Sequence, residues 1–211
     1  MGKIHKDRSH SLKFTVISIK DLQVVIQHFD KYPLRSQKLA DYILFKQAYN
    51  IILNKEHLTL EGLKRLVSIK GSVNKGLSPL LKSAFPDSIK TKRPLVSKDA
   101  ENIPDPYWIA GFTNGVKKNR YIFFRCFFIQ TIKSSNLKLG SQILLKFQLT
   151  QHSRDEKLMQ NFVEYFECGK YYSVNQKEAG HFVVYKFSDI YEKILPFFNK
   201  YEIIGEKGMI L

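Results

Sequence analysis

The side chains best suited to chemistry in this sequence are cations and amides, and they gather in its second half. From Pro106 to Arg154 no Asp or Glu occurs, whereas lysines and arginines recur throughout. Lys and Arg neutralise phosphates, and Arg, Lys and Gln also read base edges. A run of this length therefore favours a nucleic acid as the partner. Its cations are Lys117, Lys118, Arg120, Arg125, Lys133, Lys138, Lys146 and Arg154.

Polar residues in the strand-like stretches are the candidate contacts to such a partner. Alternate residues of a strand share one face, so one set can lie toward a groove. For each residue taken singly, an ordinary solvent-exposed position is the alternative. Only the group as a whole supports contact with a nucleic acid. The candidates are Arg120, Lys133, Lys146, Gln148, Gln151, Lys170 and Tyr172.

Other kinds of site are disfavoured. His57 has no second histidine at i+4, as a helical zinc pair would need. Cys126 and Cys168 are interpreted as core residues, and His152, which lies beside a strand end, as a capping or surface histidine. No phosphate-binding glycine motif occurs, and no stretch reaches the roughly 18 apolar residues of a membrane span. We therefore expect no membrane partner.

Composition is compatible with a folded, polyanion-binding protein. The 211 residues are 44% hydrophobic, which allows one large or two small domains. The formal net charge of +15 and the pI near 9.7 agree with the nucleic-acid hypothesis.

Hydrophobic periodicity divides the chain into elements that would position these residues. Near the start we expect a strand at 11–18, a helix capped by Asp21 and ended by Pro33, helices from Ser36 and Thr59, and a short helix ending near Phe85. Later elements follow the order helix, two strands, helix, two strands, helix. Their expected ranges are 107–115, 120–131, 143–151, 154–166, 170–174, 181–187 and 189–200.

Between these two sets the composition shifts to Lys, Ser, Asp and Pro, which is typical of a linker. We therefore expect one part at residues 1–86, a linker at 87–106 and a second part at 107–211.

An internal repeat connects the two parts. Matching segments lie 168 residues apart at first and 169 residues apart later, so one residue, Pro196, is interpreted as an insertion. Duplication explains the matches better than chance. The first copy then lacks its front half and the second its last helices, as in the middle of a longer two-repeat protein. The matches are 14–16 with 182–184, 21–22 with 189–190, and 29–32 with 198–201.

The stretch at 107–115 resembles the motif helix of the LAGLIDADG family of homing endonucleases and maturases. Four further segments are similar to segments of that family, in the same order. They are residues 28–42, 54–78, 147–159 and 194–201, and the motif positions are Trp108, Ala110, Gly111, Phe112 and Gly115.

This resemblance implies an α+β LAGLIDADG homing-endonuclease-like fold, with pseudo-symmetric αββαββα repeats that are incomplete in this chain. The two motif helices would pack closely at the interface between repeats, and antiparallel sheets would lie in the DNA major groove. The implied partner is DNA at an intron homing site or group I intron RNA. The implied location is the mitochondrion, and an upstream exon-encoded segment could supply missing parts.

In that family each motif helix ends in an acidic residue, and the paired carboxylates hold Mg²⁺. Here the alignment places Asn114 and Val116 at the acidic positions, and valine cannot ligate a cation. If residues 116–125 are instead an insertion, no acid follows before Asp155. We therefore expect an eroded catalytic site that holds no metal, and no DNA cleavage by this chain alone. The alternatives are a maturase of the host intron RNA and an inactive remnant.

Overall fold

The computed structural model describes residues 2–6, 12–73, 76–96, 102–115, 126–133, 140–174 and 178–204. The chain divides into two compact units, unit 1 at residues 1–100 and unit 2 at residues 101–211. The division falls inside the predicted linker. Within the described ranges no helix is long and apolar enough to cross a membrane.

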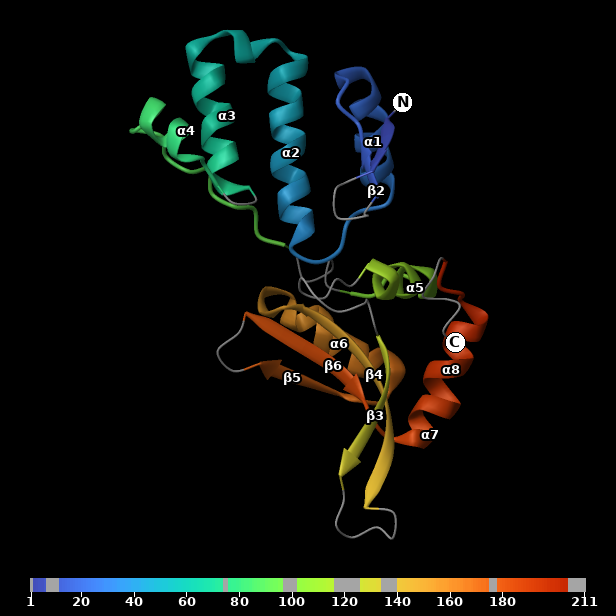
Figure 1. The fold of residues 1–211 in the computed structure, drawn as a ribbon. Helices are drawn as coiled ribbons and strands as arrows, with labels where there is room; N and C mark the ends of the chain where they lie inside the picture. Colours follow the sequence, from blue (N-terminus) through green and yellow to red (C-terminus); the bar gives the residue numbers. More distant parts are fainter. Residues whose placement is uncertain are drawn as a thin grey trace. The chain divides into compact units, whose positions relative to one another are not determined.

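Unit 2 contains a four-stranded antiparallel sheet with the order β3-β4-β6-β5 (Figure 1). Its elements follow the predicted order of helix, two strands, helix, two strands, helix. They are α5 (Pro106–Gly115), β3 (Phe127–Lys133), β4 (Ser141–His152), α6 (Glu156–Phe166), β5 (Lys170–Val174), β6 (Ala179–Val184), α7 (Phe187–Asp189) and α8 (Leu195–Lys200).

One face of this sheet forms the core of unit 2. Alternate residues of β4 and β6, among them Phe147 and Phe182, are fully buried against Phe162 of α6 and Phe198 of α8. Burying an aromatic side chain of this kind contributes about 1.5–3 kcal/mol. The far part of the β3–β4 hairpin extends past the helices (Figure 1). Ile143, near the start of β4, is 70% exposed.

The terminal helix of unit 2 contains a π turn. Residues Ile190–Ile194 form this turn between α7 and α8, and Pro196 follows in the first turn of α8. Proline has no N–H to donate, and a π turn accommodates one extra residue. Its counterpart in unit 1, α1 (Ile19–Lys31), is one residue shorter and is a regular α-helix. The π turn therefore lies where the repeat predicts an inserted residue.

Unit 1 consists of a two-stranded antiparallel hairpin followed by helices. Its core is small: Leu44, Ile51 and Ile69 are buried together. The elements are β1 (Lys3–Lys6), β2 (Leu12–Thr15), α1, α2 (Lys38–Leu53), a 3-10 turn (Glu56–Leu58), α3 (Leu60–Ser72) and α4 (Pro79–Ala84).

Part of the predicted linker is packed on unit 1. The backbone N–H of Thr91 donates to the carbonyl of Ser68 in α3. The Arg93 guanidinium pairs with Asp41 at 2.7 Å and donates to the carbonyl of Gln37 at 2.9 Å. The segment up to residue 93 is therefore ordered by polar contacts that composition does not reveal.

Several element boundaries differ from the predictions. Helix α1 begins at Ile19 with Ser18 as its N-cap, so Asp21 is not the cap but lies in the first turn, where its charge suits the helix dipole. β1 was not predicted, because four residues of mixed polarity give no clear period. The strand expected to reach Phe187 ends at Val184, because the apolar pattern continues past the last ladder pair into α7. The expected strand at 120–131 is described only from Phe127, and it continues to Lys133.

The hairpins β1–β2 and β5–β6 share one local arrangement. Lys3 pairs with Thr15 in the first, and Lys170 with Val183 in the second. A glycine precedes each lysine. A Cβ built on Gly2 or on Gly169 would lie within 3 Å of a phenylalanine ring of the neighbouring strand, Phe14 or Phe182 respectively. Only glycine fits under these rings, so the two hairpins are structurally equivalent.

Candidate nucleic-acid interface

The predicted motif helix is α5, and its apolar side belongs to the core of unit 2. Asp105 caps it by accepting from the backbone N–H of Trp108 at 2.9 Å. The Trp108 ring stacks on Phe112 at 4.9 Å, and Ala110 is buried. A Cβ on Gly111 or on Gly115 would meet no atom of the described residues within 4 Å. Trp108, Ile109 and Phe112 of this helix pack in the core of unit 2, as the sequence predicts for its apolar side.

The end of α5 does not offer the ligands that Mg²⁺ requires. Asn114 donates its side-chain amide to the carbonyl of Ile204 at 2.8 Å. Val116 lies outside the described residues. No cluster of three or more His, Cys, Asp or Glu side chains occurs in the described part of the chain. Since Mg²⁺ is bound mainly by carboxylates, the described residues here do not fit the ion.

The face of the sheet opposite Phe147 and Phe182 is called the open face. The strand registers place four of the predicted contact residues on it. It also carries Phe128, Gln130, Leu144, Thr150, His181 and Val183. The four predicted residues are Lys146, Gln148, Lys170 and Tyr172.

The other three candidates do not belong to this set. Gln151 and Lys133 have the opposite parity in β4 and β3, on the side of the sheet that bears the core. Lys133 is exposed because it lies at the far end of the hairpin. Arg120 lies outside the described residues.

A polar cluster that was not predicted lies at the centre of the open face. Thr150 Oγ1 is 2.9 Å from Nδ1 of His181 on the neighbouring strand. The Gln148 amide donates to Thr150 Oγ1 at 3.1 Å and lies 3.3 Å from the same imidazole nitrogen. Thr150 follows Gln148 by two residues, so strand alternation could have identified it. His181 needed the pairing between β4 and β6.

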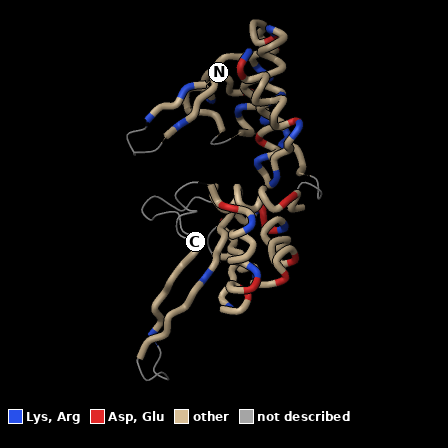
Figure 2. Tube along the Cα trace, turned by 90° about the vertical axis from the view of Figure 1, so that its right-hand side faces the viewer, with Lys and Arg blue, Asp and Glu red and all other residues tan. Residues whose placement is uncertain are grey.

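The rest of the open face is basic and aromatic. Lys146 Nζ lies 4.4 Å from the centre of the Phe128 ring, close enough for a cation–π contact. Neither Asp nor Glu occurs in β3, β4, β5 or β6. Figure 2 shows the acidic residues of this unit on its helices and turns. The open face therefore lacks the negative charges that would repel phosphates.

His152 has the capping role expected for it. Its Nδ1 accepts from the backbone N–H of Arg154 at 3.2 Å, at the start of the 3-10 turn that leads into α6. Its Nε2 lies 3.1 Å from a carboxylate oxygen of Glu178. These two contacts use both ring nitrogens for structure.

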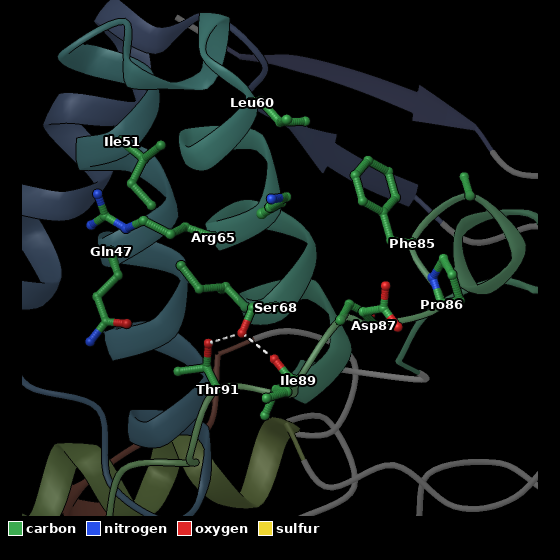
Figure 3. A pocket seen from close by; sticks show the side chains of 14 residues that line it. Gln47, Ile51, Leu60, Arg65, Ser68, Phe85, Pro86, Asp87, Ile89 and Thr91 are labelled. Atoms are coloured by element: carbon green, nitrogen blue, oxygen red, sulfur yellow. Dashed lines mark hydrogen bonds between the residues drawn. The ribbon is translucent and has the colours of Figure 1, made fainter.

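Unit 1 has an open cavity of about 700 Å³ between α2, α3 and residues 84–91 (Figure 3). Its two cations are paired with carboxylates, Lys64 with Glu61 at 3.0 Å and Arg65 with Glu56. The Ser68 hydroxyl donates to the carbonyl of Ile89. No residue predicted to contact a nucleic acid lines this cavity, and the pairing leaves little net charge to attract phosphates.

A family model described as LAGLIDADG endonuclease matches residues 1–49 and 125–210. These segments are more than half of the chain, which therefore belongs to the LAGLIDADG endonuclease family. The predicted family and fold class are confirmed. The unmatched residues 50–124 include α5, where the sequence departs from the family motif.

Curated relatives of the chain are named as intron-encoded proteins. "Probable intron-encoded endonuclease 3" of Neurospora crassa is 41% identical over 98% of this chain and 37% of its own length. "Probable intron-encoded endonuclease 2" of the same organism is 34% identical over 98% of this chain and 45% of its own length. A shorter match, 59% identical over 28% of this chain and 13% of the relative, is to an uncharacterized 50.9 kDa protein in ND4 intron 1 of Podospora anserina. The chain spans less than half the length of the first two relatives.

Solved structures agree with this assignment. The I-SmaMI LAGLIDADG homing endonuclease bound to cleaved DNA is 40% identical and superposes with a TM-score of 0.91, covering 100% of this chain and 67% of its own. The meganuclease I-CpaMI bound to uncleaved DNA is also 40% identical, with a TM-score of 0.89 over 100% of this chain and 69% of its own. I-SmaMI has also been solved on an uncleaved DNA target in the presence of calcium ions.

Proposed function

We propose that this chain binds duplex DNA across the open face of the unit 2 sheet. The observation that carries the proposal is the placement of Lys146, Gln148, Lys170 and Tyr172 on one face of strands without carboxylates. The DNA-bound structures of I-SmaMI and I-CpaMI support the choice of DNA as the polyanion.

The chemistry of these side chains divides into two roles. Lys146 and Lys170 are placed to neutralise phosphates, which supplies affinity without sequence preference. Gln148, with Thr150 and His181, presents donors and acceptors of the kind that distinguish base pairs in the major groove. Tyr172, which is 44% exposed, adds a hydroxyl and a ring at the edge of the sheet.

The proposal does not include metal-dependent cleavage by this chain alone. In this family Mg²⁺ would supply an activated water and charge stabilisation at the scissile phosphate. The alignment with the family motif places Val116 where the family has its metal-binding acid, and valine cannot ligate a hard cation. Binding is therefore proposed without hydrolysis.

The setting proposed for the chain is an organellar intron. Relatives that are named as intron-encoded endonucleases, together with the protein in ND4 intron 1, support an intron-encoded origin and, by extension, the mitochondrion. Group I intron RNA is the competing partner, because the same phosphates could attract the same lysines.

Fluorescence anisotropy of a labelled duplex, titrated with salt, tests the proposal. We expect the logarithm of the binding constant to fall linearly with the logarithm of the salt concentration, with a slope of about −3 or steeper. In parallel, a supercoiled plasmid carrying the intron insertion site is incubated with the protein and Mg²⁺, and it should stay intact.

Three results would contradict parts of the proposal. Intron RNA that outcompetes the duplex would support a maturase instead. The absence of binding to either polyanion would support an inactive remnant. Mg²⁺-dependent nicking of the plasmid would contradict the proposal that this chain alone does not cleave DNA.

A further inference from the structure

Most of the excess positive charge of this chain lies in unit 1. Residues 1–100 hold 19 lysines and arginines and 8 acidic residues, whereas residues 101–211 hold 15 and 11. Unit 1 therefore carries a formal charge of +11 and unit 2 one of +4. The excess is densest at residues 62–96, where eight lysines and arginines accompany one acidic residue, Asp87. None of these cations belongs to the open face or to the contact residues expected from the sequence.

Four lysines of this segment are exposed and pair with no carboxylate in the part of the chain that the structure describes. They are Lys70, Lys82, Lys90 and Lys92. The other described cations of the segment, Lys64, Arg65 and Arg93, are each paired with an acidic side chain. The positive charge that remains available therefore lies on α3, on α4 and on residues 86–93, which are called the strap.

The strap lies along the last turns of α3. The Thr91 backbone N–H donates to the carbonyl of Ser68 at 3.2 Å, and the two hydroxyl oxygens of these residues are 2.8 Å apart. One turn later, the Ser72 hydroxyl donates to the carbonyl of Thr91. The Arg93 guanidinium donates to the carbonyl of Ser72 at 3.3 Å. These bonds fix the strap backbone against the helix.

The fixed strap holds two of the four lysines beside α3. Lys90 and Lys92 flank Thr91, whose backbone N–H and carbonyl are both bonded to the helix. A Cβ built on Gly71 would lie 3.2 Å from Cγ of Lys90, so the glycine leaves room there for the lysine side chain. A backbone held in this way loses little further freedom when its lysines bind an anion, which favours binding. Lys90 and Lys92 are called the strap lysines.

The side chains of this segment suit a duplex better than a single strand. Proteins that bind single-stranded nucleic acids stack the bases on exposed aromatic rings. The one aromatic residue at 62–96 is Phe85, which is half-buried and lines the unit 1 cavity (Figure 3). Lysines, by contrast, contact phosphates whatever the base sequence. I-SmaMI and I-CpaMI have been solved on DNA, which favours DNA as the duplex.

We propose that α3, α4 and the strap form a second surface that binds the phosphates of duplex DNA, with the strap lysines as its main contacts. These contacts neutralise phosphates and read no base. The surface shares no element with the open face, and its binding does not require contact between DNA and the unit 2 sheet. It goes beyond the proposed function by adding affinity that is independent of sequence.

Salt titrations of the whole chain by fluorescence anisotropy test the strap lysines directly. Lys90→Gln with Lys92→Gln should weaken binding to duplexes of any sequence by about 10- to 100-fold and reduce the salt slope by about two units. Glutamine keeps the Cγ methylene that lies beside Gly71, so the strap should stay in place. Lys90→Arg with Lys92→Arg keeps both charges and should bind as the wild type does.

The matched control removes the same charge from another part of unit 1. Lys20 and Lys31 are exposed on α1. Lys20→Gln with Lys31→Gln should change the affinity by less than about 3-fold at about 0.15 M salt, because charges are screened there beyond about 8 Å. An equal loss in this control would overturn the proposal in favour of diffuse attraction by the net charge. An unchanged salt slope in the Lys90→Gln, Lys92→Gln variant would overturn it as well.

Hydrogen exchange with and without a duplex separates this surface from the proposed function. The duplex should slow exchange of the backbone amides at residues 66–73 and 88–93 at least about threefold. Protection of β4 and β6 without protection of these residues would overturn the second surface alone. The reverse pattern would contradict only the proposed function, and absence of binding to any duplex would overturn both. Tighter binding of an RNA duplex of the same length, lost in the Lys90→Gln, Lys92→Gln variant, would overturn the choice of DNA.

Discussion

Phe14 and Phe182 cover equivalent glycines in two equivalent hairpins, yet Phe14 is 62% exposed and Phe182 is fully buried. The difference lies in what surrounds them, since the strand pairing around each ring is the same. The duplicated sequence therefore builds the same local structure twice, and only unit 2 completes it within the described residues.

This difference predicts unequal costs for the same substitution. Phe182→Ala should lower the free energy of unfolding by about 3–5 kcal/mol, because it leaves a cavity in the core. Phe14→Ala should change it by less than about 1 kcal/mol, as expected for a largely exposed residue. Urea unfolding followed by circular dichroism measures both. Equal losses would show that Phe14 is buried in solution.

Lys146 and Lys170 should act on DNA through charge. Replacing either by Ala should weaken binding to a duplex of any sequence by about 3- to 10-fold and reduce the salt slope by about one unit. Lys157→Ala on α6, where Lys157 pairs with Glu164, is the control and should change neither quantity. Salt titrations by anisotropy provide both values. An unchanged slope in the Lys170 variant would remove it from the interface.

Thr150 and His181 should affect sequence preference more than general affinity. We expect Thr150→Val or His181→Phe to weaken binding to a preferred duplex, selected by the wild-type protein from a random pool, by about 5- to 100-fold. A good base contact contributes about 1–3 kcal/mol. Binding to unselected duplex should stay the same. Thr131→Val, on the opposite side of the hairpin, is the control. Identical preferred sequences for wild type and variants would refute a reading role.

Asp30 should make the stability of unit 1 depend on acid. Hydrogen bonds from Lys46, at 2.7 Å, and from the Tyr42 hydroxyl lower the pKa of Asp30 below its usual value near 3.8. Because the folded state has the lower pKa, the contribution is complete above pH 3.8 and is lost as the pH falls through the folded value. It is small because Asp30 is 43% exposed and screened by solvent.

Asp30→Asn should therefore lower the unfolding temperature of unit 1 at pH 7, and the difference from wild type should shrink below about pH 4. Thermal unfolding between pH 7 and pH 2 measures it. Asp87→Asn, at an exposed position, is the control. A difference that persists undiminished at pH 2 would mean that charge is not the cause.

Much of unit 2 could be predicted from the sequence. The periodicities of β4 and α6 are strong because each has one buried and one exposed side, so apolar and polar residues alternate regularly. The motif helix could be predicted because its apolar residues, Trp108 and Phe112 among them, lie on the side that packs against the core. Two predicted boundaries were less accurate. Asp21 suits both the N-cap and the first turn of a helix, and it lies in the first turn. Phe187 continues the apolar pattern of β6 but begins α7.

The sequence by itself determined the family, the order of elements, the repeat and the absence of acidic residues from 106–154, because each depends on residue identity and spacing along the chain. The tertiary structure decided which polar residues share a face. It separated Gln151 from Gln148, although both lie in β4, and it brought His181 beside Thr150, 31 residues away. The physical reason is that strand register and the side covered by helices arise from contacts between distant segments, which no local pattern specifies.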